Sequence, residues 1–260
     1  MRTTVRLVSI ASLLGVALVG VASAQGIHNI VLVHGAFADG SSWGKVIPIL
    51  QAKGYHVTAV QNPCTSFADD VAATQRALDL QDGPVILVGH SWAGVVITEA
   101  GADPKVRGLV YVAAFAPDQG ETVGELGKAY PPPPVLAAPI ADKQGFLTLG
   151  PDAFEKFGSD LPKADAHLAA AVQVPINASA FGAQVSNVSW KTKPTWYVVS
   201  ALDQAIAPDE ERFFAKRMKA TTTELRASHV SMLSQPKAVA AVIMQAAARA
   251  EVVSDAAPAH

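Results

Sequence analysis

The chain alternates short, β-branched apolar runs with longer helix-like segments, and this alternation limits the folds open to it. Apolar runs of this length are typical of strands buried on both faces of a sheet. The predicted strands are 29–34, 56–60, 85–88, 108–113, 195–200 and 222–225. Their β-α-β-α order predicts an α/β fold with a doubly wound, mostly parallel sheet.

Helix start and stop signals lie between these runs. Ser66 is a good N-cap, and Asp69 and Asp70 follow in the first turn, where the helix dipole favours carboxylates. The predicted helices are 42–53, 66–80, 208–218 and 236–248. The Ala-rich end from Ala246 onward is expected to be a frayed tail.

One long stretch, about 115–190, interrupts the alternation and carries no strong strand signal. Four prolines at 131–134 favour a polyproline II conformation and exclude helix or central strand there. Helix-like pieces occur at about 152–157 and 162–172. Because long connections in compact domains are usually functional, we expect a helical cap insert that covers a binding site.

The first 24 residues have the pattern of a secretory signal peptide. Arg2 and Arg6 precede an apolar stretch that ends in Ala22-Ser23-Ala24, so cleavage before Gln25 is expected. Residues 25–260 would then be a single domain, secreted or periplasmic, with no stable membrane association after cleavage. The alternative is an uncleaved membrane anchor formed by residues 7–24.

Charge and cysteine content exclude several classes of partner. The chain has 20 Lys+Arg against 22 Asp+Glu, a formal net charge of −2, so a basic face for nucleic acid is not expected. Its single cysteine, Cys64, cannot form an intramolecular disulfide, and no zinc-type spacing is present. We expect no metal and no organic cofactor, and the sequence does not indicate an oligomeric state.

The most specific local motif is Gly89-His90-Ser91-Trp92-Ala93-Gly94, which directly follows the apolar run 85–88 and precedes a helix-like segment. A nucleophile on a sharp strand-to-helix turn needs small residues two positions to either side, and Gly89 and Ala93 are small. The turn would also place Ser91 at a helix N-terminus, where negative charge is favoured. This context predicts Ser91 as a catalytic nucleophile.

Two side chains beyond later strands complete a candidate triad. Asp203 comes three residues after the predicted strand 195–200, and His229 comes four residues after the strand that ends at Leu225. Because parallel strands end at a common edge, both side chains are expected near Ser91, with His229 as base and Asp203 as its orienting acid. Asp118 is the alternative acid.

Other residues near the strand ends have predicted supporting roles. The Trp92 N–H and the Ala36 N–H, next to Gly35, are the expected donors of an oxyanion hole. Phe37, Trp92 and Phe181 are the candidate substrate contacts. His34 and His90 are interpreted as structural.

These motifs resemble those of the α/β-hydrolase superfamily, and more narrowly the small serine esterases related to plant methylesterases and hydroxynitrile lyases. The resemblance rests on Val31-Leu32-Val33-His34-Gly35-Ala36, Gly89 to Gly94, Asp203-Gln204-Ala205-Ile206 and Ser228-His229-Val230. The lyases of this family are similar to one another in having Thr where this chain has Gly35 and Lys where it has Val230. The resemblance therefore implies ester hydrolysis and not carbon–carbon cleavage.

The sequence thus predicts a serine carboxylesterase that hydrolyses small apolar or aryl carboxylic esters through an acyl-enzyme. Two alternatives share the same residues. One is a cofactor-free perhydrolase, and the other is a non-catalytic ligand-binding protein on the same fold.

Overall fold

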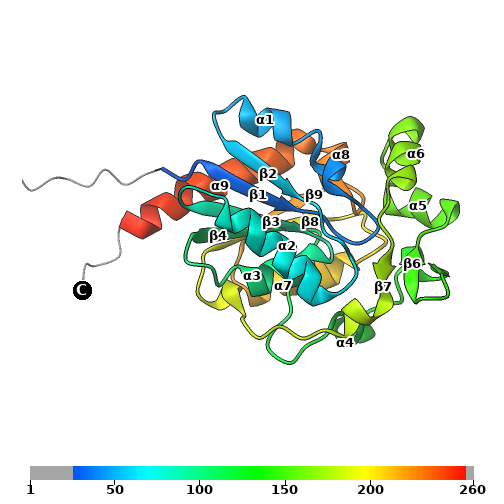
Figure 1. Cartoon of the computed structure of the whole chain (residues 1–260). Coiled ribbons are helices and arrows are strands. Elements are labelled where there is room, and N and C mark those ends of the chain that lie inside the picture. The colour runs from blue at the N-terminus through cyan, green and yellow to red at the C-terminus, as the bar shows by residue number, and fades with distance from the viewer. Residues whose placement is uncertain (1–25, 256–260) are drawn as a thin grey trace, which may run out of the picture.

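The computed structural model describes residues 26–255 (Figure 1). A central sheet lies between two layers of helices, and an insert lies beyond the carboxyl ends of the strands. The predicted leader, residues 1–24, lies outside the described residues.

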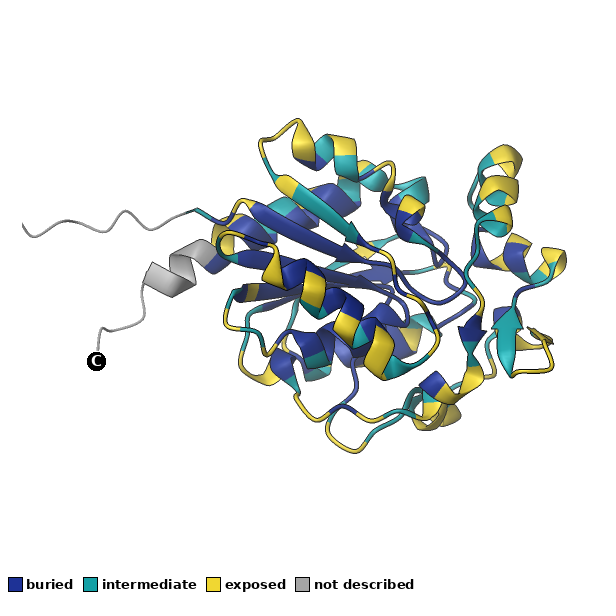
Figure 2. Ribbon diagram, in the orientation of Figure 1, coloured by how far each residue is buried: buried dark blue, intermediate teal, exposed yellow. Residues whose placement is uncertain are grey.

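The central sheet has six strands in the order β2-β1-β3-β4-β8-β9, and each neighbouring pair is parallel. Their bounds are β1 Asn29–Val33, β2 His56–Val60, β3 Val85–His90, β4 Val106–Val112, β8 Thr195–Ser200 and β9 Thr221–Leu225. The prediction of a doubly wound, mostly parallel sheet is confirmed. Burial on both faces holds for the central strands, whereas the edge strands β2 and β9 are partly exposed (Figure 2).

The helices around the sheet are η1 Gly40–Trp43, α1 Ile47–Gln51, α2 Phe67–Asp79, α3 Ala93–Ala100, α7 Pro208–Arg217, α8 Ser231–Ser234 and α9 Pro236–Asp255. The strand order reverses direction after β2, so right-handed crossovers put α1 on one face and α2, α3 and α7 on the other. The last helix, α9, packs beside α1 and against β4. The predicted helix 42–53 is instead divided into η1 and α1, with Pro48 in the first turn of α1.

The insert between β4 and β8 contains both helices and a small sheet. Its elements are α4 Val123–Leu126, η2 Gly127–Ala129, η3 Pro134–Leu136, β5 Ile140–Ala141, β6 Phe146–Thr148, α5 Pro151–Phe157, α6 Lys163–Ala171, β7 Ile176–Asn177, η4 Ala178–Gly182 and η5 Ser189–Lys191. Strands β5, β6 and β7 form an antiparallel sheet, which the sequence analysis did not predict. Strands of two or three residues are too short to leave an alternating pattern.

The expectation of a frayed tail from Ala246 is wrong. Helix α9 continues to Asp255, and Ala246, Ala247 and Ala250 are buried in the core. Small side chains let this helix lie close to the sheet, so the alanines are packing residues. No helix within residues 26–255 combines the length and the apolar character needed to span a membrane.

The packing of α3 against the segment after β4 fixes the sheet edge where the candidate residues lie. A Cβ atom at Gly94 would lie 1.9 Å from the carbonyl oxygen of Phe115 and 2.9 Å from the Ala114 side chain. On the neighbouring strand, the Tyr197 hydroxyl accepts a hydrogen bond from the Ala114 N–H at 3.0 Å. Both contacts hold the chain where it leaves β4.

Replacing Gly94 with alanine tests this close approach. The added methyl group meets backbone, which cannot rotate away, so we expect Gly94→Ala to lower the melting temperature by roughly 4–10 °C. Gly182→Ala is the matched control, because a Cβ there meets no atom within 4 Å. Equal melting temperatures for the two variants in thermal denaturation would contradict the packing described.

Candidate active site

Ser91 occupies a strained turn between β3 and α3. Its φ of 54° lies in the left-handed region, which residues other than glycine rarely adopt. The Ser91 N–H donates to the Val112 carbonyl at 3.2 Å, and the Ser91 carbonyl accepts from the Gly94 N–H at 3.0 Å. These bonds hold the hydroxyl at the carboxyl end of the sheet, as expected for a nucleophile elbow.

Two glycines allow the backbone to close around this turn. A Cβ at Gly89 would lie 2.8 Å from the Ala93 carbonyl oxygen, which explains the need for a small residue there. A Cβ at Gly35 would lie 2.7 Å from the Ser91 Cβ. The loop after β1 therefore packs directly against the serine.

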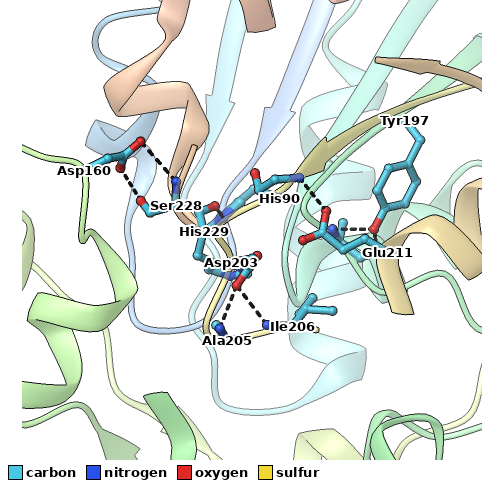
Figure 3. A network of polar contacts seen from close by, with 11 residues as sticks. His90, Asp160, Tyr197, Asp203, Ala205, Ile206, Glu211, Ser228 and His229 are labelled. Carbon is cyan, nitrogen blue, oxygen red and sulfur yellow. Dashed lines mark hydrogen bonds and ion pairs between the residues drawn. The ribbon is translucent and has the colours of Figure 1, made fainter. Parts of the chain in front are cut away.

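Asp203 and His229 form a fully buried pair. His229 Nδ1 lies 2.5 Å from Asp203 Oδ2, and neither side chain is exposed to solvent. The other carboxylate oxygen, Oδ1, accepts from the Ala205 N–H at 2.6 Å and from the Ile206 N–H at 2.9 Å (Figure 3). Because the carboxylate only accepts, this contact favours the neutral tautomer with the proton on Nδ1 and a lone pair on Nε2.

The second imidazole nitrogen of His229, Nε2, is buried and has no hydrogen-bond partner, and His229 and Ser91 border the same cavity. In the described structure, Ser91 Oγ and His229 Nε2 form no hydrogen bond with each other. Such bonds are often long without substrate and shorten when substrate binds.

His34 and His90 hold the surrounding backbone. His34 Nε2 accepts from the Asn62 N–H and its Nδ1 donates to the Gly35 carbonyl, both at 2.9 Å. His90 Nε2 donates to the His229 carbonyl at 3.0 Å. Burial lowers the pKa of both imidazoles, so they stay neutral. No cluster of three or more metal-ligating side chains occurs among the described residues.

The two amides considered as oxyanion donors border the same cavity as Ser91. Ala36 and Trp92 both line it, and neither N–H donates to a backbone carbonyl of a turn, loop or cap in the part of the chain that the structure describes. Trp92 follows Ser91 directly and is the N-cap residue of α3, so its N–H belongs to the positive end of that helix.

Asp70 has a role that the sequence analysis did not identify. Although it lies in the first turn of α2, it is completely buried and accepts hydrogen bonds from the Trp92 indole Nε1 and from the Cys64 N–H, each at 2.8 Å. The dipole interpretation fits Asp69, which bonds Thr65 and Ser66 at the surface. Asp70 instead fixes the Trp92 ring beside Ser91, and only tertiary structure reveals this.

Asp160 and Phe157 connect the insert to the histidine loop, and no sequence signal pointed to either. The Asp160 carboxylate accepts from the Ser228 N–H at 3.0 Å and also from the Ser228 hydroxyl (Figure 3). The Phe157 ring lies 4.7 Å from the His229 imidazole, centroid to centroid. The insert therefore supports the residue next to His229 and one face of its ring.

The alternative acid, Asp118, interacts with residues other than His229. Its carboxylate pairs with Lys191, and the Gln119 N–H donates to it at 2.7 Å. The described structure shows no contact between Asp118 and His229, whereas Asp203 contacts His229 directly.

The cavity above Ser91 has a volume of about 530 Å³ and is mostly apolar. Its lining includes all three candidate substrate contacts, Phe37, Trp92 and Phe181. The Trp92 and Phe181 rings meet edge to face with centroids 5.6 Å apart. A cavity of this size and character suits a small organic molecule.

Glu210 is a buried carboxylate in the lining of this cavity. Its side chain makes no hydrogen bond or ion pair within the described residues, and Oε1 is buried without a partner. Burial, and then the negative charge of Asp203, raise the pKa of Glu210 to about 7. From the sequence, Glu210 is simply an acidic residue in the first turn of a helix, so its exceptional position was not predicted.

The chain matches a model of a known protein family. A model described as "Alpha/beta hydrolase family" matches residues 30–242. The crystal structure of polyneuridine aldehyde esterase superposes with a TM-score of 0.73 at 21% identity, covering 84% of this chain and 98% of that one.

Two curated relatives illustrate the sequence similarity. "Carbendazim hydrolyzing esterase" of Nocardioides sp. is 36% identical over 122 residues, which is 40% of this chain and 49% of the relative. "Alpha-hydroxynitrile lyase" of Arabidopsis thaliana is 33% identical over 107 residues, which is 35% of this chain and 41% of the relative. The chain spans about half or less of the length of these relatives. The expected similarity to small esterases and plant lyases is confirmed.

The unpaired state of Glu210 can be tested through stability. Folding raises the pKa of Glu210 from an ordinary 4.5 to about 7. Between these two pH values the native state therefore holds a proton that the unfolded state has released. The contribution of Glu210 to stability therefore falls as pH rises through this range. The quantity compared is the melting temperature of Glu210→Gln minus that of wild type. We expect this difference to be about 2–4 °C larger at about pH 8 than at about pH 5.

Thermal denaturation of wild type, Glu210→Gln and the exposed control Glu155→Gln at both pH values measures this difference. The control removes the same formal charge at an exposed site. A Glu210→Gln effect that does not change with pH would contradict an unpaired buried carboxylate.

Proposed function

Because the chain belongs to the alpha/beta hydrolase family, we propose that it is a serine carboxylesterase in which Ser91, His229 and Asp203 form the catalytic triad. The observation that carries this proposal is the buried Asp203–His229 pair, in which Nε2 has no partner and His229 lines the same cavity as Ser91. An unaided serine hydroxyl is a weak nucleophile, and an adjacent oriented base makes it reactive.

In the proposed reaction, His229 Nε2 removes the proton of Ser91 Oγ as the oxygen attacks the ester carbonyl carbon. The Ala36 and Trp92 N–H groups stabilise the resulting oxyanion. The protonated His229 then donates its proton to the leaving alcohol oxygen, and an acyl-enzyme forms. Water deprotonated by the same nitrogen attacks the acyl-enzyme and releases the acid and the serine. Asp203 stays ionised and stabilises the imidazolium throughout.

The cavity supports small esters with apolar or aryl groups as substrates. Its volume of about 530 Å³ and its aromatic lining match a molecule of that kind. One relative is named "Carbendazim hydrolyzing esterase", which is consistent with ester hydrolysis.

Cleavage of a carbon–carbon bond in a cyanohydrin is less well supported. The family resemblance implies Thr in the lyases at the position of Gly35, and a Cβ there in this chain would lie 2.7 Å from the Ser91 Cβ. The position of their lysine is held by Val230, which is buried and cannot stabilise the charge of a departing cyanide ion.

Removing the serine hydroxyl tests the proposed reaction. We expect Ser91→Ala to lower kcat for p-nitrophenyl butanoate by at least about 10³-fold, because no acyl-enzyme can form, with an unchanged melting temperature. Ser186→Ala, an exposed serine, is the matched control and should turn over at the wild-type rate. Equal slow turnover by wild type and Ser91→Ala would indicate a non-catalytic binding protein and would contradict the proposal.

A further inference from the structure

Glu210 is the least explained charged group in the substrate cavity. The catalytic steps above do not use it, yet Glu210 is only 3% exposed and lines the cavity together with Ser91 and His229. Buried carboxylates are normally paired with a cation or well hydrogen-bonded, because desolvation of a charge is costly. Glu210 has neither kind of partner among the described residues.

Within residues 26–255, no cation compensates this carboxylate. Lys128 also borders the cavity, but it is exposed to solvent and forms no ion pair with Glu210 within the described residues. The charged group that acts most on Glu210 is another acid, Asp203. A positive charge brought by a ligand would therefore be attracted to this side of the cavity.

Aromatic rings surround the same space. The lining contains Phe37, Trp92, Phe115, Tyr130, Phe157 and Phe181. The faces of such rings attract cations, and cages of aromatic side chains are a known means of binding alkylated ammonium groups. A carboxylate together with several rings suits a cation whose charge is surrounded by methyl groups, because such a cation needs few hydrogen bonds.

We propose that Glu210 makes the cavity selective for esters that carry an alkylated ammonium group. The positive charge lies against the Glu210 carboxylate while the alkyl groups contact the aromatic rings. This inference rests on the proposed esterase function and names its substrate class. Glu210 is a specificity-determining residue in it and takes no part in the transfer of the acyl group.

A matched pair of esters isolates the charge. Butanoylcholine and 3,3-dimethylbutyl butanoate have nearly the same shape and differ in having a quaternary nitrogen or a carbon atom. We expect the wild type to have the higher kcat/KM for the choline ester. The ratio of the two kcat/KM values should fall by about tenfold or more in Glu210→Gln, which keeps the side-chain shape and loses the charge.

Glu155→Gln is the control, since it removes an exposed carboxylate of α5 and should keep the wild-type ratio. A wild type with no preference for the choline ester, or an unchanged ratio in Glu210→Gln, would overturn the inference. Turnover of 3,3-dimethylbutyl butanoate in either case would leave the esterase proposal intact.

A binding measurement separates the two proposals without turnover. Choline and 3,3-dimethylbutan-1-ol are titrated into each protein while the tryptophan fluorescence is followed, because Trp92 lines the cavity. Tighter binding of choline than of the neutral alcohol by wild type, lost in Glu210→Gln, supports the inference even if no ester is hydrolysed. Equal binding of the two alcohols by wild type would overturn it.

Discussion

The buried hydrogen bond between Asp203 and His229 is the contact on which the account of this protein depends. It joins two loops that follow the adjacent strands β8 and β9. These loops stay paired beyond the sheet. The Ala201 N–H donates to the Leu225 carbonyl at 2.8 Å, and the Leu202 N–H donates to the Ala227 carbonyl at 3.0 Å. A carboxylate hidden from water needs compensation, which two backbone N–H groups and the imidazole give to Asp203. The result is an imidazole with Nδ1 fixed by Asp203 and Nε2 without a partner in the described structure.

The insert takes part in holding this site as well as covering it. Asp160 bonds Ser228, and the Phe157 ring contacts His229, so the histidine is fixed from the sheet side and from the insert. At the other end of the insert, Arg217 bonds both carboxylate oxygens of Glu121 at 2.8 Å. Through these contacts the cavity and the loop that carries His229 form a connected structure. Among the described residues that line the cavity, Glu210 is a buried acid without compensation.

Local sequence signals were enough to predict the sheet and the position of the candidate triad, but not its supports. The central strands are continuously apolar, and Asp203 and His229 follow two of them at the expected distance. Asp160 and Ser228 are 68 residues apart, Asp70 and Trp92 are 22 apart, and no periodicity links such pairs. Glu210 resembles any acidic residue in a first helical turn, and the short strands of the insert have no pattern. The leader remains a prediction, because residues 1–24 lie outside the described structure.

The central claim, that the Asp203–His229 pair makes Ser91 reactive, is tested most directly by the rate and position of phosphonylation. Intact wild-type protein is treated with a fluorophosphonate, and the labelled peptide is identified by mass spectrometry. We expect a single label on Ser91, formed at least about 10³-fold more slowly in His229→Ala and markedly more slowly in Asp203→Asn. A label on another residue, or an undiminished rate of Ser91 labelling in both variants, would contradict the account.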